Sequence, residues 1–213
     1  IKLKMPMWKG KYSEKLVNNK IQELPEEYVV FNDLLFESNG YSTQIDHIVV
    51  SPYGVFVIET KGYKGWILGR ENGEYWTQTI YKSKHQFYNP IKQNAGHVRF
   101  LHHLLKCSTD ILFIPIVVFN NSAELKVHAD NNIVVNRYNL KRAILQYRTA
   151  VLNQETINWI IQTINQNRII ADKEKLKQHK HNAKARQYRS SRLINQGVCP
   201  QCGGHLILRK GKY

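Results

Sequence analysis

The sequence predicts an α/β protein with a central mixed β-sheet flanked by helices and followed by a basic C-terminal helical tail. Segments with apolar residues at helical spacing alternate with short segments rich in β-branched and aromatic residues. From Asp172 to Arg192 large apolar residues almost disappear, and Lys, Arg, His and Gln dominate. We therefore expect a core domain over residues 1–167, a basic helical linker over 168–195 and a small cysteine-containing element over 196–213.

The N-terminal third is predicted to contain one helix and three strands. Residues 10–24 form the helix, because Leu16, Val17, Ile21 and Leu24 recur at helical spacing. Residues 28–36, 43–50 and 54–59 are predicted strands, and the Pro-Tyr-Gly sequence at 52–54 favours a turn between the last two.

The middle of the chain continues the alternation. Asn72-Gly73 favours a hairpin between two short strands, at 66–70 and 75–80. Asn89-Pro90 introduces a helix that extends to residue 105, and the apolar run 111–119 is typical of a buried strand. That run is far shorter than the about 18–20 residues that span a bilayer. A short strand at 132–135 and helices at 139–147 and 154–165 complete the predicted core.

The charge of the chain points to a polyanionic partner. Lys and Arg number 31 against 16 Asp and Glu, so the net charge is +15. Such a balance favours nucleic acid or an anionic membrane surface, although a protein can also be merely basic. No signal-peptide pattern opens the chain, and three cysteines suit a reducing compartment. We expect a cytoplasmic protein, with membrane tethering only if an anchor precedes Ile1.

Asp46, Glu59 and Lys61 are the candidate catalytic residues. Asp46 lies in one strand of the predicted hairpin and Glu59 ends the other, so the turn at 52–54 brings the two carboxylates toward each other. Glu59 and Lys61 share a face because strand side chains alternate. Two carboxylates can hold a hard divalent cation, and a lysine can orient or deprotonate a water or stabilise phosphate charge. The alternative is an ion pair at the rim of a strand.

These residues lie in a string that resembles the nuclease-related domain, a branch of the PD-(D/E)XK nuclease superfamily. The resemblance covers residues 10–105 and is carried by four motifs: Lys11-Tyr12-Ser13-Glu14, Gln44-Ile45-Asp46-His47-Ile48-Val49-Val50, Gly54-Val55-Phe56-Val57-Ile58-Glu59-Thr60-Lys61 and Asn89-Pro90-Ile91-Lys92-Gln93. Two positions depart from the family pattern: Ile45 replaces the name-giving proline, and Ser13 stands where a glycine is usual.

The resemblance implies a restriction-endonuclease-like core and a phosphodiesterase that depends on Mg²⁺ or Mn²⁺. It implies that Asp46 and Glu59 are metal ligands and that Lys61 is the base facing water or phosphate. It also implies that Glu14 and Gln93 reach the same pocket. Without the resemblance, Glu14 could as well be an acid that stabilises the start of a helix, and Gln93 would be read as a surface residue.

Several histidines lie near the motifs without joining the predicted site. His47 neighbours Asp46 but points to the opposite face of the strand. His97, His102 and His103 lie on one predicted helix, where we expect them to face phosphate or solvent rather than bind metal.

The tail is predicted to bind the phosphate backbone of DNA, with strong salt sensitivity. The alternative is a solvated linker helix. The proposed contacts are Lys173, Lys175, Lys177, Lys180, Lys184, Arg186, Arg189 and Arg192.

Cys199 and Cys202 form a CxxC pair that can offer two thiolates to Zn²⁺. The segment resembles half of the four-cysteine ribbons at the C-terminus of type IA topoisomerases. His205 is a possible third ligand, and a redox CxxC is the alternative. Cys107 is expected to be a lone thiol.

These observations predict a DNA nuclease that uses metal-activated water and has no small-molecule substrate. A non-catalytic DNA-binding module is the alternative, and a membrane-tethered sensor is a third class that requires an upstream anchor.

Overall fold

The computed structural model describes residues 7–38, 41–106, 111–169, 192–194, 196–198 and 204–205. The chain divides into two compact units, one made of residues 1–34 and 44–168 and the other of residues 35–43 and 169–213. The candidate catalytic residues all lie in the first unit. Within the second, Leu35 forms an antiparallel bridge with Ile169, and Val198 forms one with His205.

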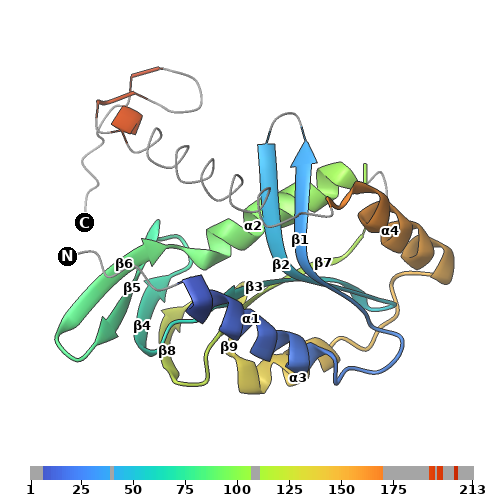
Figure 1. Cartoon of the computed structure of the whole chain (residues 1–213), viewed down its shortest axis with the longest axis horizontal. Helices are drawn as coiled ribbons and strands as arrows, with labels where there is room; N and C mark the ends of the chain where they lie inside the picture. Colours follow the sequence, from blue (N-terminus) through green and yellow to red (C-terminus); the bar gives the residue numbers. More distant parts are fainter. Residues whose placement is uncertain are drawn as a thin grey trace. The chain divides into compact units, whose positions relative to one another are not determined.

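The described elements are a mixture of helices and strands, as predicted for an α/β protein (Figure 1). In chain order they are α1 (Met7–Ile21), β1 (Val29–Ser38), β2 (Tyr41–Ser51), β3 (Gly54–Lys61), β4 (Gly65–Arg70), β5 (Tyr75–Ile80), β6 (Ser83–Tyr88), α2 (Pro90–Leu104), β7 (Phe113–Phe119), β8 (Ala123–His128), β9 (Ile133–Asn136), α3 (Arg137–Leu145) and α4 (Gln154–Asn167).

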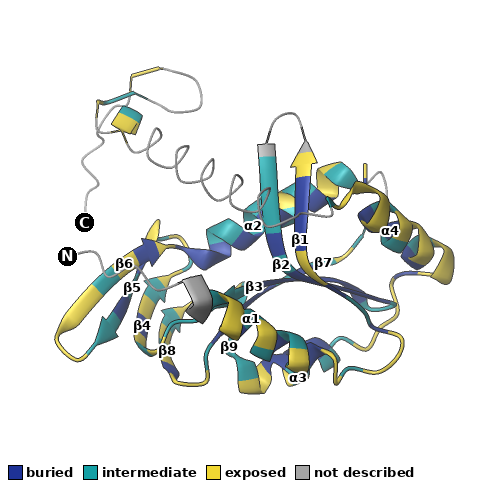
Figure 2. Cartoon of the chain, in the orientation of Figure 1, coloured by how far each residue is buried: buried dark blue, intermediate teal, exposed yellow. Residues whose placement is uncertain are grey.

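The larger sheet is mixed, which confirms the predicted fold class. Its strand order is β1-β2-β3-β7-β9, with β2 antiparallel to β3 and β7 parallel to both β3 and β9. β3 is buried from Gly54 to Glu59 and becomes partly exposed only at Thr60 and Lys61 (Figure 2). Glu59 is therefore the last buried residue of β3, the central strand of this sheet.

Helices cover both faces of this sheet. On one face, Val17 and Ile21 of α1 and Leu140 of α3 join the core around Phe56 and Ile58 of β3. On the other face, α2 contacts β3 and β7. Since neighbouring strand residues face opposite sides, Glu59 does not share the α1–α3 face of Ile58 and instead lies under α2.

A second, four-stranded sheet has the order β6-β5-β4-β8, with β4 parallel to β8. Its inner side chains Ile67, Trp76 and Phe87 pack with Phe119 and Ala123. A side chain at Gly69 would collide with the Trp76 ring, so this position requires glycine. Among the described helices, none packs along the strands of this sheet.

The sequence predicted β4 and β5, with their turn at Asn72-Gly73, but not the neighbouring strands β6 and β8. Both missed strands lie at the edges of their sheet. In β6 only Phe87 is buried, and in β8 only Ala123 is. Polar residues occupy most of β6, which therefore lacks the apolar pattern that identifies a strand in sequence. β8, in contrast, alternates apolar and polar residues, so its sequence does carry a strand signal.

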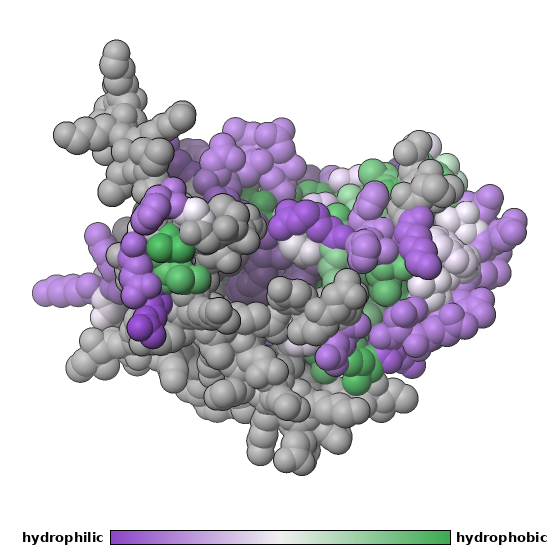
Figure 3. Space-filling view, turned by 90° about the horizontal axis from the view of Figure 1, so that it is seen from above, coloured by the Kyte–Doolittle hydropathy of each residue, from purple (hydrophilic) through white to green (hydrophobic). Residues whose placement is uncertain are grey.

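The predicted helix boundaries shift by a few residues. α1 ends at Ile21 rather than Leu24, and Leu24 continues in a turn that packs against the core. α3 begins at Arg137, two residues before the expected start, and α4 ends at Asn167. In the part of the chain that the structure describes, no helix is both long and apolar enough to cross a bilayer. Among the coloured residues of Figure 3, hydrophilic side chains predominate and apolar ones form small patches.

His47 is buried in β2 and is held as a neutral ring. Its Nδ1 lies 2.7 Å from Asn32 Oδ1, and its Nε2 has no hydrogen-bond partner among the described residues. Burial lowers the pKa of His47 from the usual 6.5 to about 4, against the opposing effect of Glu59 and Asp33. The side chain is not part of the hydrogen-bond network of the candidate site, as the sequence predicted.

This burial predicts a specific pH dependence of stability. Because the folded pKa is depressed, the unfolded chain takes up a proton first as the pH falls below about 6.5, and stability is lost progressively until about pH 4. Between pH 7 and pH 5, the protonation of His47 in the unfolded chain lowers the free energy of unfolding by about 2 kcal/mol. Urea unfolding in EDTA at both pH values measures it. His47→Gln should remove this part of the difference, and an unchanged difference would contradict the buried neutral ring.

Candidate active site

Asp46 and Glu59 lie on neighbouring strands at the end of the β2–β3 hairpin. His47 pairs with Ile58, so Asp46 lies opposite Glu59, and residues directly opposite in an antiparallel pair share a face. Asp46 is partly buried, and its Oδ2 accepts a hydrogen bond of 2.8 Å from the Thr60 amide. That bond fixes the Asp46 carboxylate at the strand end beside Glu59.

Glu59 is the hub of the site and is 3% exposed. Its Oε1 accepts hydrogen bonds from Lys61 Nζ at 2.7 Å and from Gln93 Nε2 at 2.8 Å. Its Oε2 lies 3.2 Å from His97 Nε2. Lys61 Nζ also donates to Gln93 Oε1 at 2.9 Å, so Glu59, Lys61 and Gln93 form a closed triangle of hydrogen bonds.

Helix α2 brings Gln93 and His97 to Glu59. Its N-cap, Asn89, is fully buried and accepts a hydrogen bond from the Ile91 amide. The Asn89 side-chain amide also donates to the backbone carbonyls of Arg70, Glu71 and Gly73. These contacts attach the start of the helix to the β4–β5 turn, and Pro90 at the first helical position suits the helix start.

Asn94 fixes α2 over the junction of β3 and β7. Its Nδ2 donates to the Val57 carbonyl at 2.8 Å and to the Ile116 carbonyl at 3.2 Å. Gln93 precedes it, and His97 lies one helical turn after Gln93, so the two side chains face the same region. A helix anchored by Asn94 over Val57 places them at Glu59, two residues further along β3.

The charges of the site are strongly coupled. Burial would raise the pKa of Glu59, but Lys61 and His97 lower it to about 2. Burial would lower the pKa of Lys61, but the Glu59 carboxylate raises it above its usual value. At neutral pH the pair is therefore a carboxylate and an ammonium. A protonated Lys61 suits contact with phosphate better than the role of a base in this resting state.

Asp46 has the opposite electrostatic environment. Burial, Glu59 and Glu14 together raise its pKa well above the usual value, against the opposing effects of the Thr60 amide and Lys61. Glu14 of α1 is thus close enough to Asp46 to act on its charge. Three acids, Glu14, Asp46 and Glu59, converge on one region, and a nearby cation would relieve their repulsion.

These residues fit a hard divalent cation in a particular way. Within the described ranges, no group of three His, Cys, Asp or Glu side chains stands ready to hold a metal ion. Mg²⁺, however, is usually held by one or two carboxylates, with water and substrate phosphates completing its shell. The opposed carboxylates of Asp46 and Glu59 match that pattern, and their repulsion favours a bound cation.

The structure brings together all five catalytic candidates from the sequence: Glu14, Asp46, Glu59, Lys61 and Gln93. It also adds two residues. His97 was expected to face phosphate or solvent, but it is buried against Glu59, and that expectation is wrong. Nothing in the sequence indicated a role for Asn94 apart from its position next to Gln93. The spacing of Gln93 and His97, one helical turn apart, could have indicated a shared target.

Most of the proposed DNA-binding tail and both cysteines of the CxxC pair lie outside the described residues: Lys173, Lys175, Lys177, Lys180, Lys184, Arg186, Arg189, Cys199 and Cys202. Cys107 also lies outside them. Arg192 is exposed at the start of a short helical segment, and His205 is exposed. The DNA and zinc interactions of these residues stay predictions.

Comparison with known proteins agrees with the geometry of the site. The model of the nuclease-related domain family matches residues 9–120, which include every catalytic candidate and His97. An uncharacterised protein of Bacillus anthracis is 36% identical over 195 residues, which cover 88% of this chain and 91% of that protein. No solved structure is significantly similar to the chain. The chain belongs to the nuclease-related domain family.

Proposed function

We propose that this chain is a divalent-metal-dependent deoxyribonuclease that hydrolyses phosphodiester bonds with metal-activated water. The observation that supports it best is the pairing of two opposed carboxylates with a buried ammonium. Asp46 faces Glu59, and Lys61 lies 2.7 Å from Glu59 Oε1. A simple structural ion pair would need only Glu59 and Lys61. It would not need the additional acids Asp46 and Glu14, whose proximity is electrostatically unfavourable.

In this proposal, Asp46 and Glu59 hold Mg²⁺ or Mn²⁺. The ion, when bound, supplies a water of lowered pKa and neutralises charge on the phosphate. The Thr60 amide keeps Asp46 Oδ2 in place, and Glu59 remains ionised at neutral pH. Glu14 adds negative potential near Asp46 and raises local attraction for the cation.

Lys61 supplies the positive charge for the transition state. Its ammonium has three N–H donors. One donates to Glu59 and one to Gln93, so the third can donate to a phosphate oxygen. Charge held in place before the reaction stabilises the developing phosphorane charge without reorganisation. Gln93 orients Lys61 and Glu59 together, and His97 holds the second oxygen of Glu59.

The basic tail would supply affinity rather than chemistry. The lysines and arginines between residues 173 and 192 would bind the DNA backbone by counterion release. Cys199 and Cys202 would contribute two thiolates to a zinc site that takes its other ligands elsewhere.

The proposal is tested with the full-length protein on linear duplex, circular duplex and single-stranded DNA. Each is incubated with Mg²⁺, with Mn²⁺ or with EDTA, and the products are resolved by gel. We expect cleavage with a metal and none with EDTA, and no cleavage by the Asp46→Asn protein under any of these conditions. DNA binding without cleavage under all metal conditions would replace the proposal with a non-catalytic DNA-binding module.

A further inference from the structure

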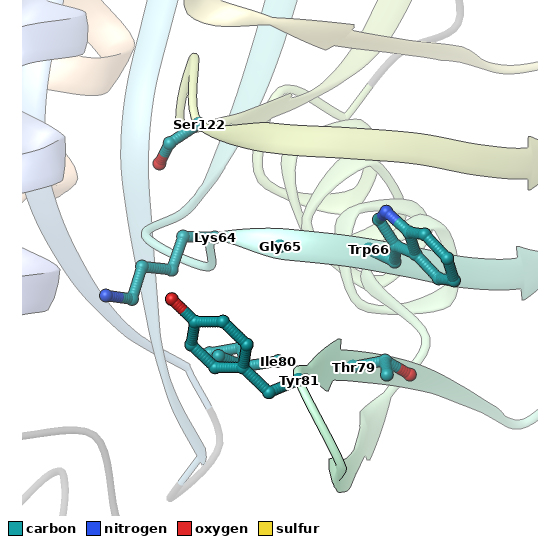
Figure 4. A pocket seen from close by; sticks show the side chains of 7 residues that line it. All are labelled: Lys64, Gly65, Trp66, Thr79, Ile80, Tyr81 and Ser122. Carbon is teal, nitrogen blue, oxygen red and sulfur yellow. The ribbon is translucent and has the colours of Figure 1, made fainter.

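A pocket of about 440 Å³ lies at the start of β4 (Figure 4), and β4 follows the strand that carries Glu59 and Lys61. Its walls come from the start of β4 and the residue before it, from the end of β5 with the β5–β6 turn, and from the loop before β8. The lining residues are Lys64, Gly65, Trp66, Thr79, Ile80, Tyr81 and Ser122. Lys64 follows Lys61 by three residues, so their Cα atoms are at most about 11 Å apart. The pocket is therefore next to the proposed site of hydrolysis.

The floor of this pocket is fixed by hydrogen bonds. The buried side chain of Gln78 donates to the Lys64 carbonyl at 2.8 Å, and the Gly65 amide donates to the Ser122 carbonyl at 3.0 Å. Gly65 has a φ of 77°, and a Cβ there would lie 2.5 Å from the Thr79 carbonyl oxygen. Only glycine fits at this position, so the depression is part of the folded backbone rather than a gap between side chains.

Two aromatic side chains at this pocket have no role in the core. Tyr81 is 98% exposed and Trp66 is 49% exposed. Tyr81 also has a φ of 51°, a conformation that glycine or asparagine adopts at lower cost. Figure 4 shows the Tyr81 ring beside the Lys64 side chain, with Trp66 further along β4. Neither stability nor turn formation explains an exposed tyrosine here.

Exposed aromatic and cationic side chains also occur elsewhere on the outer face of the β6-β5-β4-β8 sheet. Tyr75 and Tyr88 form an exposed cross-strand pair with ring centroids 6.2 Å apart. A second hollow of about 420 Å³ is lined in part by Arg70, Tyr75 and Lys126. Aromatic rings and cations thus alternate along a sheet face without a covering helix contact in the described elements.

Within the four described strands of this sheet, the one acid is Glu124. Glu124 Oε1 is 3.3 Å from Lys126 Nζ, and Lys126 Nζ is 3.7 Å from the centre of the Trp66 ring. These groups are exposed, so the contacts are weak and Lys126 can leave the ring to meet a phosphate. Even with Glu71 and Glu74 of the β4–β5 turn counted beside Glu124, the four cations Lys64, Arg70, Lys84 and Lys126 leave the net charge positive, which complements a phosphate backbone.

We propose that this face binds an unpaired DNA strand next to the site of hydrolysis, with bases stacked on Trp66 and Tyr81 and a phosphate held by Lys64. Bases of a single strand can stack on aromatic rings, whereas bases of a duplex are stacked on one another. The proposal rests on the proposed function, because it names the form of DNA that the nuclease site receives. It makes the substrate a single strand, or the unpaired end or flap of a duplex.

The test measures binding in EDTA, so that no cleavage is needed. Fluorescence anisotropy of a labelled single strand and of the matching duplex is recorded with the full chain at raised salt, where backbone contacts of the tail contribute less. Trp66→Ala and Tyr81→Ala should each weaken single-strand binding about tenfold, the range of one lost stacking contact, and leave duplex binding nearly unchanged. Tyr81→Phe keeps the ring and should retain wild-type affinity.

Matched controls come from exposed aromatics elsewhere in the first unit. Tyr138 of α3 is 78% exposed and Trp159 of α4 is 40% exposed, so Tyr138→Ala and Trp159→Ala remove comparable rings. Equal losses in these controls, unchanged single-strand affinity in Trp66→Ala and Tyr81→Ala, or an equal loss for duplex would overturn the proposal. A chain that never cleaves DNA but loses single-strand affinity on Trp66→Ala would refute the nuclease function and leave this binding face standing.

Discussion

Asp46→Asn is expected to abolish metal-dependent cleavage without destabilising the fold. Asparagine keeps an oxygen that can accept the Thr60 amide hydrogen bond, but it loses the charge that would hold the cation. The cation is worth several kcal/mol of transition-state stabilisation, so the rate should fall by at least about a thousandfold. Initial rates on a labelled strand at saturating Mn²⁺ measure this loss.

The same substitution should leave the free energy of unfolding in EDTA equal to that of the wild type or higher. Asp46 is partly buried and is repelled by Glu59 and Glu14, as its raised pKa shows. A neutral side chain removes that repulsion. A variant that is more stable but inactive would indicate that the negative charge of Asp46 serves catalysis and not folding. Wild-type cleavage by Asp46→Asn would show that the assigned site is wrong.

Lys61→Arg is expected to lose at least about a hundredfold in rate, nearly as much as Lys61→Ala. The Lys61 ammonium is a compact donor that meets both Glu59 Oε1 and Gln93 Oε1 within 2.9 Å. A planar guanidinium is larger and cannot occupy that point while it also meets a phosphate. Single-turnover rates at saturating DNA separate this loss of chemistry from weaker binding.

The control for Lys61 is Lys20→Ala, which removes a cation that pairs with Glu23 on the surface of α1. It should change the cleavage rate little, because exposed pairs contribute little and a single surface charge affects mainly affinity. Full activity of Lys61→Arg would show that Lys61 acts only through its positive charge. Lys61→Ala should also lower stability, since it leaves Glu59 buried without its cationic partner.

The sequence by itself determined the hairpin that carries Asp46, Glu59 and Lys61. Alternation of side chains and a Pro-Tyr-Gly turn are local properties, so the facing of the side chains and the approach of the two acids follow from neighbouring residues. The strand ends do not, because β2 extends over Tyr41–Ser51 and β3 over Gly54–Lys61, both longer than predicted. The same holds for the start of α2 at Asn89-Pro90, where a capping residue and a proline act within one helical turn.

The resemblance implied that Gln93 reaches the pocket of Glu59, but only the tertiary structure decided that His97 also does and how α2 brings both there. Gln93 and His97 are 34 and 38 residues away in sequence, and they reach Glu59 because Asn94 anchors α2 across the carbonyls of β3 and β7. That contact depends on a parallel pairing of β3 with β7, which no local pattern encodes. The aromatic pocket has the same origin, since Trp66, Tyr81 and Ser122 come together only when β4 pairs with both β5 and β8.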